Sequence, residues 1–480
     1  MSKHKPHYII LLFTILTMFL LSSTNSNRTE ISHTFTRGFT HTSIEDPTHF
    51  GENSRHLSLN ILEVNPSRIG VHVTAPNHSA TQLEMLIDQA NRLNSRGYNV
   101  IGGINGDMYA MAQLGVAEGQ PSCLTVIDGE IITMHSTFDE SRALPVFAVD
   151  YNGEPYFGHL ILRLSAELYR NGSRTRALNL SQFNRNYHLT PWDIVIFTPR
   201  ISGDGIIRIL TAEEVEYHGV ENLDEWEFAI IELENGEDKI VAGQRFSGTI
   251  VEVVDDLENA KVSNGTVVFA GHNLMRNQRL MIGDTIKFEA NIHKTPASDR
   301  GDFGEPVNHF TEIIGAYNWL VRDGAIQTEE DWQEIGLPLD WLITTAPART
   351  GIGIREDGTI LAVTVDQIFG ETEGMTMPEF AQLFYELGAV QALNFDGGSS
   401  TEMIVLDENG EFITVNTPTG LYARPISTGL LFASDSSNIR GLGHSATDEI
   451  ILWVLFSSLA ILAASSALLG IIKLKKKMKS

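Results

Sequence analysis

The sequence has 480 residues, of which 42% are apolar and 20% are charged, and its formal net charge is −26. This length and apolar content allow one large or two ordinary globular domains and exclude an intrinsically disordered chain. The acidic balance argues against a nucleic-acid partner, because phosphate backbones are bound by clustered Lys and Arg. With Cys123 as the single cysteine, no internal disulfide can form.

Residues 1–24 contain a basic start followed by an apolar run, which predicts a signal peptide or an N-terminal membrane anchor. Residues 25–55 are polar and lack a sustained hydrophobic period, so we interpret them as a linker. Residues 56–159 form the first part of the predicted main domain. There, alternating residues predict two strands, Ser79 and Gln82 predict a helix cap, and a strand ends in Asn105, Gly106 and Asp107.

Residues 160–312 consist of short β-type runs separated by turns and predict a β-rich insertion or second lobe that does not carry the chemistry by itself. The main domain resumes over residues 313–433. An apolar strand ends at Asp366, Thr376 and Glu379 predict a capped helix, and a second strand delivers Asn394 and Asp396. The predicted fold class is therefore α/β (α+β), with helices on a mixed sheet and a right-handed crossover that places the site at the carboxyl ends of parallel strands.

The carboxyl-terminal end predicts a membrane span. Residues 434–449 serve as a spacer, residues 450–472 are uncharged and long enough to cross a bilayer, and five lysines follow in the tail at 473–480. The positive-inside rule makes that tail cytoplasmic and the main domain extracytoplasmic. We therefore expect the protein in the cell membrane.

Several polar residues stand where predicted strands end, and these are the candidates for chemistry. Carboxylates are needed for proton transfer or nucleophilic attack, and cations or free amides for binding an anion. We predict catalytic roles for Asp107, Asp366, Asp396 and Glu402. We predict substrate-binding roles for Asn105, Arg349, Thr350, Asn394, Gly397, Gly398, Ser399, Ser400 and Arg424.

Other interpretations of these residues stay open. Glu402 could be a surface or capping group, Asp366 could cap a loop, and Arg349 could pair structurally with an aspartate. The hydroxyl residues after Asp396 lack a Gly-x-Ser-x-Gly elbow, which disfavours a serine nucleophile. The scattered histidines disfavour a zinc motif, whereas calcium or magnesium held by Asp oxygens is compatible with the sequence, so no metal ligand is assigned.

In order and spacing, the segments at 104–109, 348–353, 365–366, 374–376, 387–389, 392–403 and 424–427 together resemble the phosphodiester glycosidase family. The resemblance covers the chain from about Leu57 to Ala433. It implies hydrolysis of the bond between a sugar anomeric carbon and a phosphate outside the cytoplasm. We expect no required cofactor. The chain departs from the family in having Ser399 after two glycines, and in having Asp107, Met108 and Tyr109 where the family often has Gly-Phe-Phe after the first Asn-Gly. The substrate is therefore less constrained than the fold.

Within this resemblance we expect Arg349 and the amides of Gly397 and Gly398 to hold the phosphate. Asp396, with Asp366 or Asp107, would serve in acid, base or nucleophilic roles. Two alternatives remain, a surface protein that binds glycans without catalysis and a metal-dependent phosphoesterase. The expected partners are a phosphodiester-linked sugar or glycan and the membrane. The sugar and the oligomeric state are unassigned.

Overall fold

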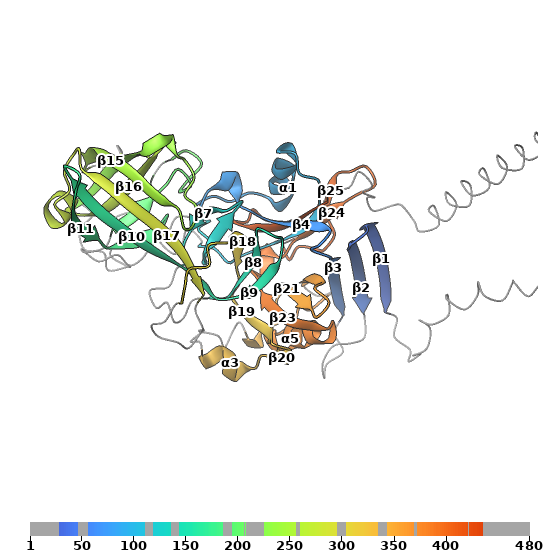
Figure 1. Ribbon diagram of the computed structural model, residues 1–480. Helices are drawn as coiled ribbons and strands as arrows, with labels where there is room; N and C mark the ends of the chain where they lie inside the picture. Colours follow the sequence, from blue (N-terminus) through green and yellow to red (C-terminus); the bar gives the residue numbers. More distant parts are fainter. Residues whose placement is uncertain are drawn as a thin grey trace, which may run out of the picture.

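The computed structural model describes residues 28–46, 56–110, 119–135, 144–185, 194–205, 207, 225–255, 260–294, 304–334, 343–368, 372–420 and 422–434. Within these residues the strands gather into four sheets, with a lobe at one end of the molecule and the β1–β3 edge at the other (Figure 1). No helix in the described ranges is long and apolar enough to cross a membrane. The predicted membrane segments at 1–24 and 450–472 lie outside those ranges.

The first sheet has the order β1-β2-β3-β22-β21-β23-β19-β20, and all its neighbours are antiparallel. Its strands are β1 (Thr29–Thr36), β2 (Phe39–Asp46), β3 (Leu57–Val64), β22 (Ile360–Val365), β21 (Arg349–Arg355), β23 (Ala389–Asn394), β19 (Asn318–Arg322) and β20 (Ala325–Ile326). Residues 28–46, which we had interpreted as linker, thus form a hairpin on this sheet. Phe35 and Phe39 anchor the hairpin because both are fully buried in the core.

Two five-stranded sheets pack near the first. One has the order β25-β24-β5-β26-β4, with β25 (Phe412–Thr414), β24 (Met403–Leu406), β5 (Val100–Asn105), β26 (Gly429–Ser434) and β4 (Ile69–Thr74). The other has the order β7-β6-β18-β8-β9, with β7 (Glu130–Thr133), β6 (Thr125–Ile127), β18 (Phe310–Gly315), β8 (Val146–Asp150) and β9 (Pro155–Gly158). All three sheets contribute to one hydrophobic core, which contains Leu62, Ile104 and Ile314.

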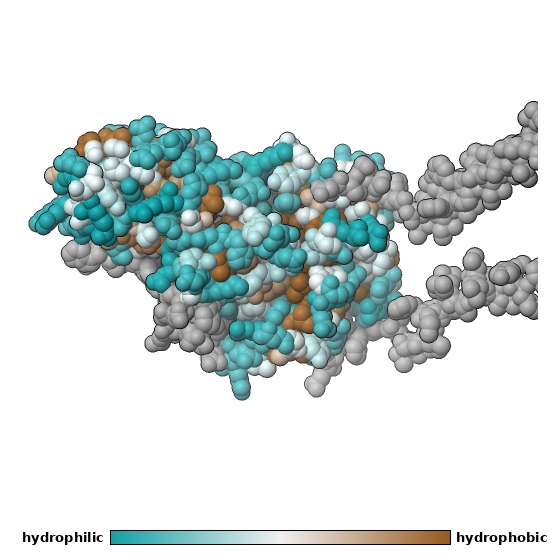
Figure 2. Space-filling view, viewed as in Figure 1, coloured by the Kyte–Doolittle hydropathy of each residue, from teal (hydrophilic) through white to brown (hydrophobic). Residues whose placement is uncertain are grey.

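The lobe is an eight-stranded sheet of order β11-β10-β17-β15-β14-β16-β13-β12, drawn mainly in green and yellow in Figure 1. Its strands are β11 (Ser173–Leu178), β10 (Leu160–Arg170), β17 (Thr285–Lys294), β15 (Arg245–Val254), β14 (Trp226–Leu233), β16 (Thr266–His272), β13 (Ile194–Phe197) and β12 (Leu180–Phe183). A second core containing Phe288 joins it to the sheet that contains Ala148 and Ile313. The face of the molecule seen in Figure 2 is mostly hydrophilic, with smaller apolar areas between the polar ones. Most large apolar side chains of the described residues are buried.

Helices are few among the described residues. The α-helices are α1 (Leu86–Ser95), α3 (Glu329–Glu334) and α5 (Met377–Glu386), and short turns of other helix types are η1 (Pro76–His78), η5 (Glu234–Gly236), η7 (Leu274–Gln278) and η8 (Gly398–Ser400). The predicted cap of α5 is confirmed, because Thr376 and Glu379 bond each other's backbone amides. The predicted cap at Ser79 is wrong. Ser79 donates its hydroxyl to the carbonyl of Pro76, and α1 begins only at Leu86.

The predicted α/β fold class is wrong, because the architecture is dominated by antiparallel strands. We had taken the unbroken apolar run in β22 as a mark of a parallel strand, yet its neighbours β3 and β21 both run antiparallel to it. The run is apolar because both faces are covered. Ile360 and Ala362 enter the core shared by the three sheets, while Leu361 and Val363 pack with Phe380 of α5.

The predicted crossover between two parallel strands that end at Asp366 and Asp396 is also corrected. β22 and β23 run in the same direction, but β21 lies between them and is antiparallel to both. The two aspartates still follow strand ends on one edge of the sheet. The strands that carry them, β22 and β23, are two strand spacings apart, about 10 Å.

Candidate functional site

The two predicted turns, residues 105–107 and 394–402, meet in the structure although they belong to different sheets. Asn105, at the end of β5, is 1% exposed. Its side-chain amide donates to the carbonyl of Asp396 at 2.7 Å, and its Oδ1 accepts from the Thr350 hydroxyl at 2.7 Å and from the Glu402 amide at 3.1 Å. The Asp396 amide completes the junction by donating to the Gly106 carbonyl at 3.0 Å. The side chains of Asn105 and Thr350 therefore hold the two turns together, and their hydrogen-bonding groups are used for this purpose and not for a ligand.

Asp107 lies behind this junction and is 2% exposed. Its Oδ2 accepts from the Cys123 amide at 2.8 Å, whereas its Oδ1 has no hydrogen-bond partner among the described residues. Burial raises the pKa of Asp107 to about 7; the nearby charge of Asp396 acts in the same direction, and that of Arg185 opposes it. The backbone at Gly315 leaves room for this carboxyl, since a Cβ there would lie 2.4 Å from Oδ2.

Asp396 is more open than Asp107, with 16% of its side chain exposed. Its Oδ1 accepts from the Gly397 amide at 3.0 Å, and its Oδ2 lies 3.6 Å from Nη2 of Arg424. Burial raises the pKa of Asp396 to about 6, although hydrogen bonding to Ser400 and the positive charge of Arg424 both lower it. Asp396 is thus partly solvated, whereas Asp107, with which it interacts electrostatically, is buried.

Arg424 is held over Asp396 by its neighbours. Its Nε donates to the Ser400 hydroxyl at 3.0 Å, and its guanidinium carbon lies 5.4 Å from the centre of the Tyr109 ring. The Tyr109 hydroxyl in turn donates to the Pro425 carbonyl at 3.2 Å. The predicted residues Ser400 and Arg424 are therefore brought to Asp396, and Tyr109 joins them.

Arg185 acts on Asp107 through its charge, His135 lies close enough to Arg185 to feel the same charge, and our sequence analysis missed both. Arg185 follows β12 of the lobe, is 5% exposed and donates to the carbonyls of Met134 and Pro121. His135 follows β7 and is 6% exposed, and its Nδ1 has no hydrogen-bond partner in the described part of the chain. Burial, together with the charge of Arg185, lowers the pKa of His135 to about 4. Neither residue stands in a sequence motif. They are recognised as part of the site only from the tertiary structure, in which the lobe packs against the main domain.

Asp366 and Glu402 have separate surroundings. Oδ2 of Asp366 accepts from the Ser58 hydroxyl and from the Thr417 amide, each at 2.9 Å. Glu402 is 1% exposed, its Oε1 accepts from the Thr414 hydroxyl at 2.9 Å, and its Oε2 has no hydrogen-bond partner among the described residues. Burial raises the pKa of Asp366 to about 6 and that of Glu402 to about 7.

The side chain of Arg349 donates hydrogen bonds to two backbone carbonyls. It is 1% exposed, its Nε donates to the Met375 carbonyl at 2.8 Å, and its Nη2 donates to the Thr345 carbonyl at 3.0 Å. Burial lowers the pKa of Arg349 to about 10. Asn394 is also buried, at 2% exposed, and its Oδ1 is unpartnered within the described ranges.

The glycine turn after Asp396 already uses two of its amides. The Gly397 amide donates to the carboxylate of Asp396, and the Gly398 amide donates to the Ala348 carbonyl at 2.8 Å. Gly398 has a φ of 59°, a conformation that favours glycine. Ser399 is exposed. In this structure the turn shapes the position of Asp396.

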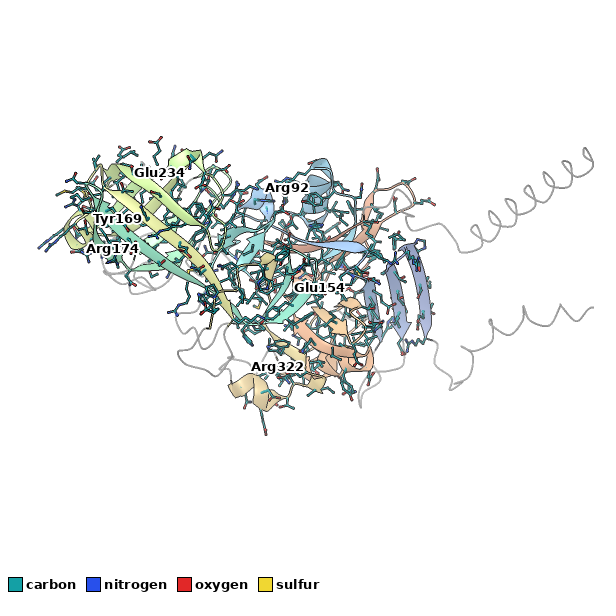
Figure 3. All side chains as sticks on the ribbon, in the orientation of Figure 1. Arg92, Glu154, Tyr169, Arg174, Glu234 and Arg322 are labelled. Carbon is teal, nitrogen blue, oxygen red and sulfur yellow. The ribbon has the colours of Figure 1, made fainter. Side chains whose placement is uncertain are left out.

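Two surface grooves, of about 470 and 390 Å³, lie on the lobe. The first is lined by Tyr169 and Glu234 and the second by Arg174, and Figure 3 shows these three side chains at the outer end of the lobe. Arg245 and Lys287 line both grooves. The carboxyl pair is therefore not part of either groove.

Residues 241–433 match the sequence model of the family described as phosphodiester glycosidase. Over these residues the chain is similar to the phosphodiester glycosidases. The resemblance predicted from the motifs is confirmed, and the matched segment includes Asp366, Asp396 and Arg424. Asp107, His135 and Arg185 precede it, so the site combines this segment with earlier parts of the chain.

Curated relatives share shorter segments with this chain. The N-acetylglucosamine-1-phosphodiester alpha-N-acetylglucosaminidase of Mus musculus is 29% identical over 110 residues, which is 21% of this chain and 20% of that protein. The Homo sapiens protein of the same name is 23% identical over 175 residues, covering 31% of this chain and 33% of that protein. The chain thus spans about a fifth to a third of the length of the curated relatives it matches.

Two solved structures share the fold. A putative exported protein from Burkholderia pseudomallei K96243 superposes with a TM-score of 0.61 at 15% identity and covers 87% of this chain and 98% of that chain. A hypothetical protein from Synechocystis gives a TM-score of 0.58 at 19% identity and covers 84% of this chain and 64% of that one. At these identities the likeness concerns the fold alone.

Proposed function

We propose that the protein hydrolyses a phosphodiester that links the anomeric carbon of a sugar to another group. The family match supports this reaction class, and the names of the curated relatives describe the same type of bond. The observation that carries the proposal is the pair of buried carboxyls, Asp107 and Asp396, with the cations Arg185 and Arg424 beside them. Carboxyls supply proton transfer or attack, and cations bind the phosphate.

The pKa values of the pair suggest a division of roles. Asp396 has a pKa of about 6 and is partly open to solvent, so near neutral pH it is ionised and able to attack the anomeric carbon or to activate water. Asp107 has a pKa of about 7 and retains its proton more readily. Because the two pKa values differ, one acid and one base can coexist in the same site.

The proposed reaction keeps the phosphate as the leaving group. The bond between the anomeric carbon and the phosphate oxygen breaks, and its electron pair stays on that oxygen. A hydroxyl from water ends on the sugar, and the remaining proton ends on the phosphate product or on a carboxylate. A phosphate leaving group needs little protonation, so the larger contribution of the site is to hold its negative charge. Arg424, with 35% of its side chain exposed, is placed to meet that charge from solvent.

The proposed setting is the outer face of a membrane, with the main domain extracytoplasmic. The support is the sequence at residues 1–24 and 450–472 and the lysine-rich tail. Protease treatment of intact cells that express the full chain tests this setting. Digestion of the main domain with protection of the tail is the expected result, and protection of both parts would contradict it.

The activity is tested with the full chain and a panel of sugar-1-phosphodiesters, by measuring the free sugar released. We expect turnover of at least one donor, retention of activity in a chelator, and loss of turnover in the Asp396→Asn variant. Glu402→Gln is the matched control, because it removes the charge of another carboxyl with a raised pKa, one that is more deeply buried and contacts Thr414 instead of a cation. Sugar binding without turnover would favour a glycan-binding protein, and release of a sugar phosphate in place of free sugar would favour a metal-dependent phosphoesterase.

A further inference from the structure

Three metal-ligating side chains converge at a place outside the carboxyl pair. His72 comes from β4, Asp128 from the turn between β6 and β7, and Glu312 from β18. One potential ligand atom from each lies within 4.8 Å of the other two. The three positions are far apart in sequence, which is why the histidine spacing gave no metal motif.

The buried member of this cluster is held in place by the backbone. Only 5% of the Glu312 side chain is exposed, and its Oε2 accepts from the Val73 amide at 2.9 Å. Its Oε1 lies 3.8 Å from Nδ1 of His72. This separation is longer than the roughly 3.2 Å limit of an ordinary hydrogen bond. It is close to the spacing of about 3.5 Å expected for two ligands that each lie about 2.1 Å from one ion.

The other two ligands are also oriented by neighbours. Tyr98 donates its hydroxyl to Asp128 at 3.3 Å, and its ring packs edge-on against His72 with the ring centres 4.7 Å apart. A Cβ at Gly70 would lie 2.7 Å from Nε2 of His72, so that nitrogen faces the backbone while Nδ1 faces Glu312. Second contacts of this kind are typical of side chains that hold a metal ion.

We propose that His72, Asp128 and Glu312 bind a divalent transition-metal ion such as Zn²⁺, with water completing its coordination. One imidazole nitrogen and two carboxylate oxygens suit this class of ion, whereas calcium and magnesium prefer oxygen ligands alone. The ion would join β4 to β6 and β18, and therefore one five-stranded sheet to the other. Its role would be structural, and it does not depend on the proposed hydrolase activity.

The test uses the full chain stripped with a chelator, dialysed and titrated with ZnCl₂ by calorimetry, with thermal unfolding recorded in parallel. We expect one ion to bind with micromolar affinity and to raise the melting temperature. Glu312→Gln and Asp128→Asn should each weaken binding at least tenfold. Asp128→Asn is expected to fold, because Asp128 has a φ of 49° and asparagine tolerates this conformation well.

His272→Ala provides the matched control, since His272 also faces one carboxylate, Glu225, but belongs to no three-ligand cluster in the described residues. It should bind Zn²⁺ like the unmodified chain. The proposal is overturned if the unmodified chain binds no Zn²⁺ when the ZnCl₂ concentration is raised to about 100 times the expected micromolar dissociation constant. It is also overturned if the cluster variants bind as tightly as the control. Loss of binding in Asp107→Asn with binding retained in Asp128→Asn would place the ion at the carboxyl pair instead and equally refute it.

Discussion

Two pairs of carboxyls, Asp107 with Asp396 and Asp366 with Glu402, look alike in sequence and differ in their surroundings. Burial raises the pKa of all four above its ordinary value. The first pair lies beside two arginines, whereas Asp366 and Glu402 accept hydrogen bonds from hydroxyls and a backbone amide. Burial alone raises the pKa of a carboxyl. The neighbouring cations are what make the first pair suited to a phosphate-linked substrate.

The largest expected effect comes from removing the charge of Asp396. Asp396→Asn should lower kcat by roughly 10²–10⁴-fold, because a positioned carboxylate contributes about that much to proton transfer or attack. Initial rates of sugar release measure it, and the circular dichroism spectrum checks that the variant is folded. A variant that retains more than a tenth of the activity would remove Asp396 from the mechanism.

Removing a cation should have the next largest effect. Arg424→Ala should lower kcat/KM by about 10–10²-fold, since one charged donor to the developing phosphate charge is lost. Arg424→Lys should recover part of the loss because it restores the charge without the forked geometry. Equal activity in all three proteins would show that Arg424 serves only to position Ser400.

The pH profile should reflect the two carboxyls of the first pair. Activity should rise as Asp396 ionises at a pKa of about 6 and fall as Asp107 loses its proton at a pKa of about 7, giving a narrow bell in kcat/KM. Rates measured between pH 4 and 9 provide the check. A profile that keeps rising above pH 8 would contradict a protonated Asp107 as the acid.

The second pair should affect stability more than activity. In the folded state the pKa of Glu402 is about 7, above its ordinary value of 4.5. Between these two pH values the folded state therefore binds more protons than the unfolded state. The free energy of unfolding therefore falls as the pH rises from about 4.5 to about 7. Above pH 7 the whole loss of stability caused by ionising the buried Glu402 is present. Glu402→Gln should raise the free energy of unfolding at pH 8 by up to about 3 kcal/mol and give no gain at pH 4.

Urea unfolding at the two pH values measures this effect, with sugar release as the second readout. Activity within a factor of a few of the unmodified protein is expected for Glu402→Gln and for Asp366→Asn. A loss as large as that of Asp396→Asn would erase the distinction between the two pairs.

The smallest expected effect concerns the junction of the turns. Thr350→Val removes the hydroxyl that donates to Asn105 at 2.7 Å and should cost about 1 kcal/mol of stability. Thr419→Val, at an exposed position, should change stability by less than half of that. Urea unfolding compares the two variants. Similar values would mean that Asn105 does not depend on Thr350.

Local patterns predicted the elements near the site well. Glycine and capping residues located α5 and the strands on either side of it, and the strand-end positions of Asp107 and Asp396 were readable from apolar runs that stop at a turn. The same patterns misassigned the fold class, because a strand covered on both faces has the same composition whether its neighbours are parallel or antiparallel. They also missed the hairpin at residues 28–46, whose threonines and histidines resemble a linker.

The sequence by itself determined the family resemblance, the strand ends that carry carboxyls and the turn that follows Asp396. Only the tertiary structure decided that Asn105 ties the two turns together and that Arg185 of the lobe reaches Asp107. It also brought together the separated ligands His72, Asp128 and Glu312. The physical reason is that hydrogen bonds and charges act across a few ångströms, and the pairing of sheets decides which distant residues come that close.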